Sequence, residues 1–119
     1  MIEQKLRPRR MRLSKGIRSL VRETSLSVKD FVYPLFVVPG ENIVEPIPSM
    51  PGCNHLSVDK AVDLAREIFD LGIPAVEVFG LPEYKDEIGS SAWDRKSPVQ
   101  RAVAAIRKAV PELVLVGDV

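Results

Sequence analysis

The sequence predicts an α/β fold in which helices cover a parallel sheet. Three short apolar runs alternate with two longer segments that carry apolar residues at helical spacing. The runs are nearly continuous in apolar residues, which is typical of parallel strands buried on both faces. A basic segment with a proline precedes the first run and predicts an extended N-terminal arm.

The first half of the chain predicts one short helix and one strand. From Ser14 to Glu23 the apolar residues follow the spacing of a short amphipathic helix. Residues 31–38 are mostly β-branched or aromatic and predict a buried strand, with Pro34 expected at its start or at a bulge. Residues 41–56 hold three prolines and predict an ordered but irregular connection.

The second half predicts two helices, each followed by a strand. Ser57 is a suitable N-cap for the first helix, and Gly72 is a suitable C-terminal cap. A strand is expected over 75–79 and a polar loop over 81–96. The second helix is expected to start at the N-cap Ser97, followed by Pro98, and to end at Pro111. A third strand is expected over 113–116.

Two architectures accommodate this order of elements: an open doubly wound sheet and a (β/α)8 TIM barrel. A doubly wound nucleotide-binding protein carries a glycine-rich turn after its first strand, and no GxGxxG or GxxxxGK[ST] pattern occurs in this sequence. The predicted strands are centred about 40 residues apart, so eight units need roughly 320 residues, as in a barrel. The chain is therefore predicted to be a partial TIM barrel, with its first three strands and two helices.

Composition excludes several classes of protein. The chain has 119 residues, 45% of them hydrophobic and 28% charged, which is typical of a globular domain. One cysteine and one histidine exclude a disulfide framework and a zinc site built from a cysteine–histidine cluster. No run approaches the roughly 20 apolar residues that span a bilayer, and no secretory signal is evident. A cytoplasmic chain without membrane partners is expected.

The charge is distributed unevenly along the chain. Residues 1–22 hold eight basic residues against one acidic residue and carry +7, whereas the remaining residues carry −6. Such an arm could bind nucleic acid or pair with acidic groups on another copy of the chain. It has no aromatic residue of the kind that nucleic-acid readers interleave with basic groups, so a contact between subunits is favoured. A solvated basic tail is the alternative.

The sequence resembles the N-terminal third of the porphobilinogen synthase (δ-aminolevulinic acid dehydratase) family along nearly all of its length. The proline-rich motif around residues 45–52 is especially specific. The matching segments are Arg7-Pro-Arg-Arg-Met-Arg12, Val21-Arg-Glu-Thr-Ser-Leu26, Tyr33-Pro-Leu-Phe-Val37, Glu45-Pro-Ile-Pro-Ser-Met-Pro-Gly52, Leu71-Gly-Ile-Pro-Ala-Val76, Phe79-Gly80 and Lys85-Asp-Glu-Ile-Gly-Ser90.

The resemblance implies a homo-oligomeric lyase of haem and tetrapyrrole biosynthesis that condenses two 5-aminolevulinate molecules to porphobilinogen. It implies octamer-type assemblies in which the arm contacts a neighbouring subunit, here through Arg7, Arg9, Arg10 and Arg12. In the family, two lysines form Schiff bases with the substrates late in the barrel, and a Zn²⁺ or Mg²⁺ site follows the third strand. The lysines and the metal ligands are therefore expected beyond residue 119.

Two residues of this chain are candidates for the active site on the basis of the resemblance. Asp118 follows the third predicted strand, where the family has an active-site aspartate, and barrel enzymes place their chemistry at this end of the strands. Its alternative role is to cap the next turn. Phe79 ends the second predicted strand on the same side and is a candidate for substrate contact, although an aromatic residue there is also typical of a core.

Three other reactive residues are interpreted as structural. Lys85 lies in a polar loop beside acidic neighbours and is expected at the surface rather than as a Schiff-base lysine. Cys53 and His55 are too few to form a metal site and are expected to pack.

We expect residues 1–30 to form the arm and residues 31–119 to form an incomplete barrel domain. The isolated chain is expected to be inactive, and an assembly module that docks through its arm is the alternative function.

Overall fold

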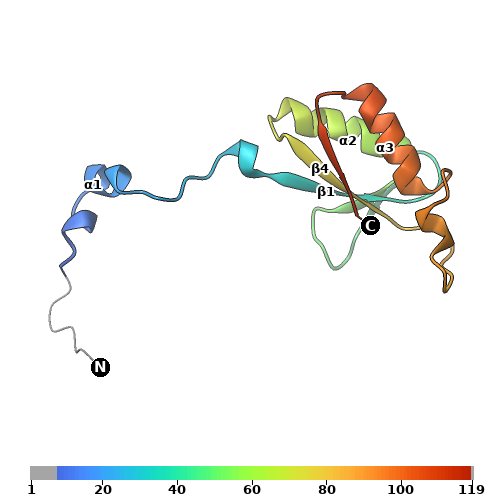
Figure 1. Cartoon of the computed structure of the whole chain (residues 1–119), viewed down its shortest axis with the longest axis horizontal. Coiled ribbons are helices and arrows are strands. Elements are labelled where there is room, and N and C mark those ends of the chain that lie inside the picture. The colour runs from blue at the N-terminus through green and yellow to red at the C-terminus, as the bar shows by residue number, and fades with distance from the viewer. Residues whose placement is uncertain (1–7, 119) are drawn as a thin grey trace.

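The computed structural model describes residues 8–118, and within them one mixed sheet is covered by helices on one face (Figure 1). Five strands follow the order β2-β3-β1-β4-β5 across the sheet. Neighbouring strands are parallel except for the antiparallel pair β2–β3. The strand bounds are β1 Val32–Val37, β2 Val44–Pro46, β3 Asn54–Leu56, β4 Ala75–Gly80 and β5 Val114–Gly117.

The two long helices lie side by side on one face of the sheet. They are α2, Val58–Asp70, and α3, Pro98–Ala109, and both lie above the sheet in Figure 1. Each turns an apolar stripe toward the strands, so that Ala65, Ile68 and Ile106 are fully buried. The core therefore lies between these helices and the three strands β1, β4 and β5, as the predicted alternation of strand and helix requires.

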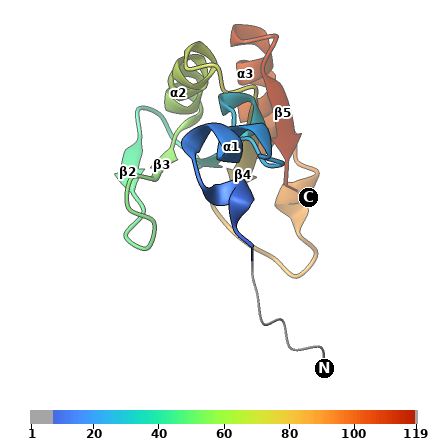
Figure 2. The same ribbon diagram turned by 90° about the vertical axis from the view of Figure 1, so that its left-hand side faces the viewer.

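The irregular connection predicted over residues 41–56 is wrong. The antiparallel strands β2 and β3 form there, joined by residues 47–53, where the Ile47 amide donates to the Cys53 carbonyl at 3.0 Å. Pro46 ends β2, which is an edge strand, and a proline at an edge costs the sheet few hydrogen bonds. Figure 2 shows this hairpin at one margin of the sheet and β5 at the other.

The expectation for Pro34 also differs from the structure. Pro34 is the third residue of β1 and pairs in register with Glu77 of β4. Among residues 8–118, strand β3 pairs with β1 only at Phe36 and Val37, so at Pro34 the strand β1 has no described neighbour on its other side. Proline is tolerated within this strand because its position is locally that of an edge.

The predicted caps of the long helices are correct in position but not all in their bonding. Ser57 precedes α2, yet its hydroxyl accepts the Ile43 amide at 2.9 Å and makes no cap hydrogen bond to the helix. Ser57 is thereby buried and ties the start of α2 to the loop after β1. At the other end, Gly72 has φ +84° and its amide donates to the Phe69 carbonyl, while the Ile73 amide donates to the Ile68 carbonyl. These two bonds form a Schellman motif.

The described part of the arm extends away from the sheet (Figure 1). It holds η1 Arg10–Arg12, α1 Lys15–Leu20 and η2 Val28–Asp30. The helix α1 is shorter than the predicted 14–23, and Ser14 caps it by accepting the Ile17 amide at 3.2 Å. Between residues 8 and 30 every residue except Ile17 is exposed, so this segment buries little surface against its own body.

Candidate active site at the carboxyl ends of the strands

The carboxyl ends of β4 and β5 bring together the residues singled out in the sequence. Asp118 follows β5 directly, and its amide donates to the Val78 carbonyl at 3.3 Å, which holds it beside the end of β4. Phe79 stands near the end of β4, in register with Phe36 of β1. Both therefore lie at the end of the strands where barrel enzymes place their active sites.

Phe79 packs against an aromatic neighbour that the sequence did not single out. Its ring stacks on Phe36 with centroids 5.4 Å apart and an angle of 20° between the planes. Both rings lie on the sheet face opposite the helices, because the register pairs them and the residues that alternate with them are buried in the core. Half-buried rings on an uncovered face form an apolar wall rather than part of the core.

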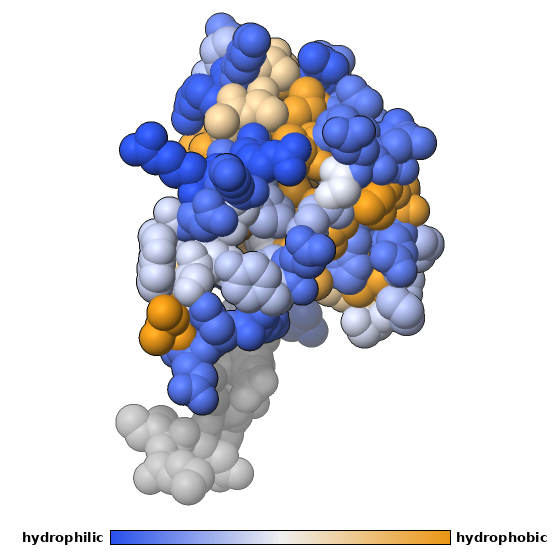
Figure 3. Space-filling view, turned by 90° about the vertical axis from the view of Figure 1, so that its right-hand side faces the viewer, coloured by the Kyte–Doolittle hydropathy of each residue, from blue (hydrophilic) through white to orange (hydrophobic). Residues whose placement is uncertain are grey.

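A hollow of about 360 Å³ lies beside Asp118. The helix α3 contributes its first turn, and the loop 81–96 contributes the opposite wall. Its lining residues are Gly80, Pro82, Ser91, Ala92, Ser97, Pro98, Val99, Gln100 and Asp118. In Figure 3, which views the molecule from this side, most of the surface is hydrophilic, with hydrophobic residues showing between the polar ones.

Gln100 is a further polar residue on this hollow, besides Asp118 and two serines, that the sequence did not single out. Its Nε2 donates to the Ala92 carbonyl at 2.6 Å, while its buried Oε1 accepts no hydrogen bond from the described residues. The exposed Asp118 carboxylate on the lining can accept from a ligand that donates hydrogen bonds, such as an amine, whereas the Gln100 Oε1 atom is buried. The place of Gln100 beside Asp118 depends on how the first turn of α3 packs against the end of β5, which no local pattern indicates.

The loop 81–96 is held in shape by Asp86. Its carboxylate accepts the Ser90 amide at 2.8 Å and also the Ser90 hydroxyl. These bonds from Ser90 lower the pKa of Asp86 below its ordinary value, because they favour the ionised carboxylate. Gly89 adopts φ +62° at the turn between the two residues. Lys85 precedes this turn and is exposed, as expected for a surface residue.

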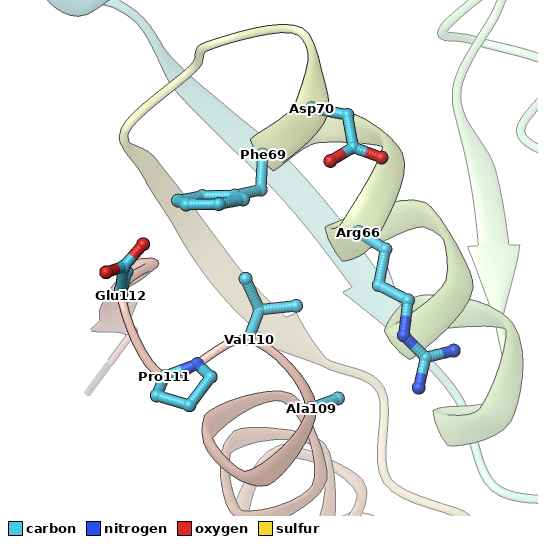
Figure 4. Close-up of a pocket in the computed structure, with 7 residues that line it drawn as sticks. All are labelled: Arg66, Phe69, Asp70, Ala109, Val110, Pro111 and Glu112. Atoms are coloured by element: carbon cyan, nitrogen blue, oxygen red, sulfur yellow. The ribbon is translucent and has the colours of Figure 1, made fainter.

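A second hollow, of about 490 Å³, lies at the opposite end of the strands. Figure 4 shows Phe69 and Val110 lying across it from the ends of the two long helices, with Asp70 and Glu112 at its margins. Arg66 pairs instead with Asp63, at 3.1 Å. This hollow adjoins the loops that lead into β4 and β5, so it lies at the end of the sheet where barrel enzymes stabilise the fold rather than perform chemistry.

The structure separates the remaining candidates from this site. Arg9 precedes η1, and Arg10 and Arg12 lie within it, all exposed on the arm, while Arg7 lies outside the described residues. Cys53 is half-buried in the connection between β2 and β3, and His55 of β3 lies in register with Glu45 of β2. Within residues 8–118, no three His, Cys, Asp or Glu side chains are grouped as a metal site would require. No helix among these residues is long and apolar enough to cross a membrane.

Comparison with known families decides the relationship that the motifs suggested. A family model described as delta-aminolevulinic acid dehydratase matches residues 5–119. The chain belongs to the delta-aminolevulinic acid dehydratase family. Enzymes of this name from Synechocystis and Synechococcus elongatus are 51% and 49% identical to it over 113 and 112 residues. The one from Bacillus subtilis is 45% identical over 112 residues.

The chain corresponds to about a third of a family member. The matches to Synechocystis and Synechococcus elongatus cover 95% and 94% of this chain but only 35% and 34% of those proteins. A crystal structure of the dehydratase from Toxoplasma gondii, in complex with the reaction product porphobilinogen, superposes with a TM-score of 0.88 and 33% identity. That match covers 98% of this chain and 33% of the other. The predicted fold class is confirmed: the chain matches a portion of the family's TIM barrel.

Proposed function

We propose that this chain forms the first third of a porphobilinogen synthase, a hydro-lyase that condenses two 5-aminolevulinate molecules to porphobilinogen for haem and tetrapyrrole biosynthesis. The family match over residues 5–119 carries the proposal. The fit to a solved dehydratase that holds porphobilinogen supports it. The enzyme acts in the cytoplasm, and neither nucleic acid nor membrane is among its partners.

The chain needs the rest of the barrel for activity. Residues 1–30 are the arm, and residues 31–119 are an incomplete domain that contributes the first three barrel strands, β1, β4 and β5, and two helices. Three strands cannot close a barrel, and the face of the sheet opposite the helices stays uncovered in the described residues. The Schiff-base lysines that the family uses belong to the segment beyond residue 119, so the isolated chain does not turn over substrate.

Asp118 and Phe79 are this chain's contribution to the active site. The Asp118 carboxylate orients the amine of a substrate or exchanges a proton with it, and the Phe79–Phe36 pair supplies an apolar wall. Their position at the carboxyl ends of the strands supports both roles. A Zn²⁺ or Mg²⁺ ion, held by ligands that follow residue 119, would serve as a Lewis acid for the second substrate.

The arm joins subunits of a homo-oligomer of the octamer type. Arg7, Arg9, Arg10 and Arg12 contact the body of a neighbouring subunit. The charge of +7 on residues 1–22 against −6 on the rest of the chain supports this role. The exposure of the arm supports it as well, because an arm that packed on its own body would not be free to reach another.

A colour assay for porphobilinogen tests the proposed activity. The isolated chain, incubated with 5-aminolevulinate, is expected to form no product above background, whereas the protein expressed from its complete reading frame is expected to form it. Asp118→Asn in that complete protein is expected to lower kcat at least tenfold, with Asp94→Asn in the loop 81–96 as the control. Turnover by the isolated chain, or an inactive complete protein, contradicts the proposal.

The exposed arm also favours a second function, in which the chain alone acts as an assembly module that docks on full-length subunits. Size-exclusion chromatography of the chain mixed with the full-length Synechocystis relative tests this function. Co-elution that is lost when Arg9, Arg10 and Arg12 are replaced by glutamate supports docking through the arm. Separate elution of the two proteins removes this alternative.

A further inference from the structure

The loop 81–96 forms one wall of the hollow beside Asp118, yet little packing holds it against the rest of the fold. Beyond its first two residues, only Ser90 and Ser91 are half-buried, and every other residue of the loop is exposed. Even Trp93, the only tryptophan of the chain, is 65% exposed. Burial of apolar surface therefore does little to fix the position of this wall.

The hydrogen bonds inside the loop shape it without attaching it to the helices or the sheet. The Ser90 amide donates to the Asp86 carboxylate at 2.8 Å. The Ala92 amide donates to the Gly89 carbonyl at 2.9 Å. Because all these partners belong to the loop, the bonds make residues 86–92 one unit but do not determine where that unit lies.

One side-chain hydrogen bond attaches this unit to the body of the protein. The Nε2 atom of Gln100, in the first turn of α3, donates to the Ala92 carbonyl at 2.6 Å. The first residue of the loop, Leu81, is held separately, because its amide donates to the Val37 carbonyl at 2.8 Å. Within the described residues 8–118, no other hydrogen bond or ion pair links residues 82–93 to a residue outside the loop.

The surroundings of the Gln100 amide explain why it faces the loop in this way. Reversing the amide would bring its oxygen against the Ala92 carbonyl oxygen, so the nitrogen faces the loop. The Oε1 atom is buried and accepts no hydrogen bond from the described residues. A buried acceptor without a partner costs stability, and an apolar side chain at this position would avoid that cost. The bond to the loop is therefore what the amide contributes here.

We propose that Gln100 is a positioning residue for the reaction: its amide latches the loop 81–96 onto α3 and so fixes the wall against which a substrate amine lies beside Asp118. The inference rests on the proposed function, because the hollow receives substrate only if Asp118 does. Without the latch, the loop leaves this position for part of the time, and the apparent affinity for substrate falls by the same fraction. Saturating substrate draws the loop back, so the rate at saturation is kept.

The mobility of Trp93 tests the latch in the 119-residue chain. Gln100→Met and Gln100→Glu keep the length of the side chain and remove the donor, because neither a thioether nor an ionised carboxylate donates a hydrogen bond. Time-resolved fluorescence anisotropy of Trp93, next to Ala92, is expected to show the equilibrium between free and latched loop shifted toward the free form by about two- to tenfold, as for the loss of one hydrogen bond. Lys108→Met, on the exposed far end of α3, is the matched control and is expected to leave the anisotropy unchanged. Unchanged Trp93 motion in both Gln100 variants, at equal circular dichroism at 222 nm, overturns the proposal.

The kinetics of the protein expressed from its complete reading frame test the positioning role. Gln100→Met is expected to raise KM for 5-aminolevulinate by about two- to tenfold and to leave kcat within about twofold, in contrast to the loss of kcat in Asp118→Asn. An unchanged KM in an active Gln100→Met variant, or a kcat that falls with KM constant, overturns the inference and leaves the proposed function standing. An inactive unmodified protein refutes the proposed function instead, and the Trp93 measurement still decides whether Gln100 latches the loop.

Discussion

The close approach of Gly80 to α3 is a sharp test of how the candidate site is positioned. A Cβ built on Gly80 would overlap the Cγ2 methyl of Val99, in the first turn of α3. Valine in a helix has one strongly preferred rotamer, so this methyl cannot easily turn aside. Glycine at this position therefore lets the first turn of α3 pack directly on the end of β4, one residue after Phe79.

Gly80→Ala is expected to destabilise the fold by about 1–3 kcal/mol, the usual cost of overpacking. For a chain of this size, each kcal/mol lowers Tm by about 3–6 °C. Gly117→Ala in β5 is the control, because a Cβ there meets no atom within 4 Å. Thermal unfolding followed by circular dichroism at 222 nm measures both variants.

A second substitution identifies the cause. Val99→Ala removes the methyl that a Cβ on Gly80 would overlap, so the Gly80→Ala and Val99→Ala costs should not add. The double variant is expected to be more stable than the sum of the single variants by about 1 kcal/mol or more. Strict additivity, or a Gly80→Ala variant as stable as Gly117→Ala, refutes the argument from close packing.

Two further predictions concern a turn and the loop beside the site. Gly72→Ala is expected to lower the free energy of unfolding by about 1 kcal/mol, because residue 72 has φ +84°, where alanine is strained. A Cβ at this position meets no close contact, so backbone strain alone causes the loss. A Tm equal to that of the unmodified chain contradicts this prediction. The Asp86–Ser90 bonds lower the folded pKa of Asp86 below its unfolded value, so their stabilisation is present above about pH 4 and is lost as the pH falls through the folded pKa. The protection of the loop 81–96 against amide exchange, taken relative to the intrinsic exchange rate at each pH, is expected to fall on acidification. Ser90→Ala is expected to shift the onset of this loss to higher pH, and an onset unmoved by Ser90→Ala contradicts the assignment.

The sequence predicted those features that depend on local spacing. Apolar periodicity located α2 and α3, and Gly72 marked the end of α2 because a positive φ favours glycine. The predicted strands over 75–79 and 113–116 agree closely with β4 and β5. Asp118 and Phe79 could be placed at one end of the sheet because each comes at or just after the end of a predicted parallel strand.

Features that depend on register could not be predicted. The β2–β3 hairpin was missed because its prolines indicate a loop, although Pro46 lies in the edge strand β2 and the other two lie in the connection between the strands. The stacking of Phe79 on Phe36 depends on how β1 and β4 are aligned, and many alignments fit one sequence. Gln100 joins the hollow beside Asp118 only because α3 begins there.

Complementation of the barrel tests the central claim most directly. The 119-residue chain is mixed with the part of the Synechocystis relative that follows its matched region, and porphobilinogen formation from 5-aminolevulinate is measured. We expect activity from the mixture, none from either part alone, and at least a tenfold loss when the mixture contains Asp118→Asn. Product formed by the chain alone, or a folded mixed complex that forms none, would contradict the claim that this chain is the first third of a dehydratase barrel.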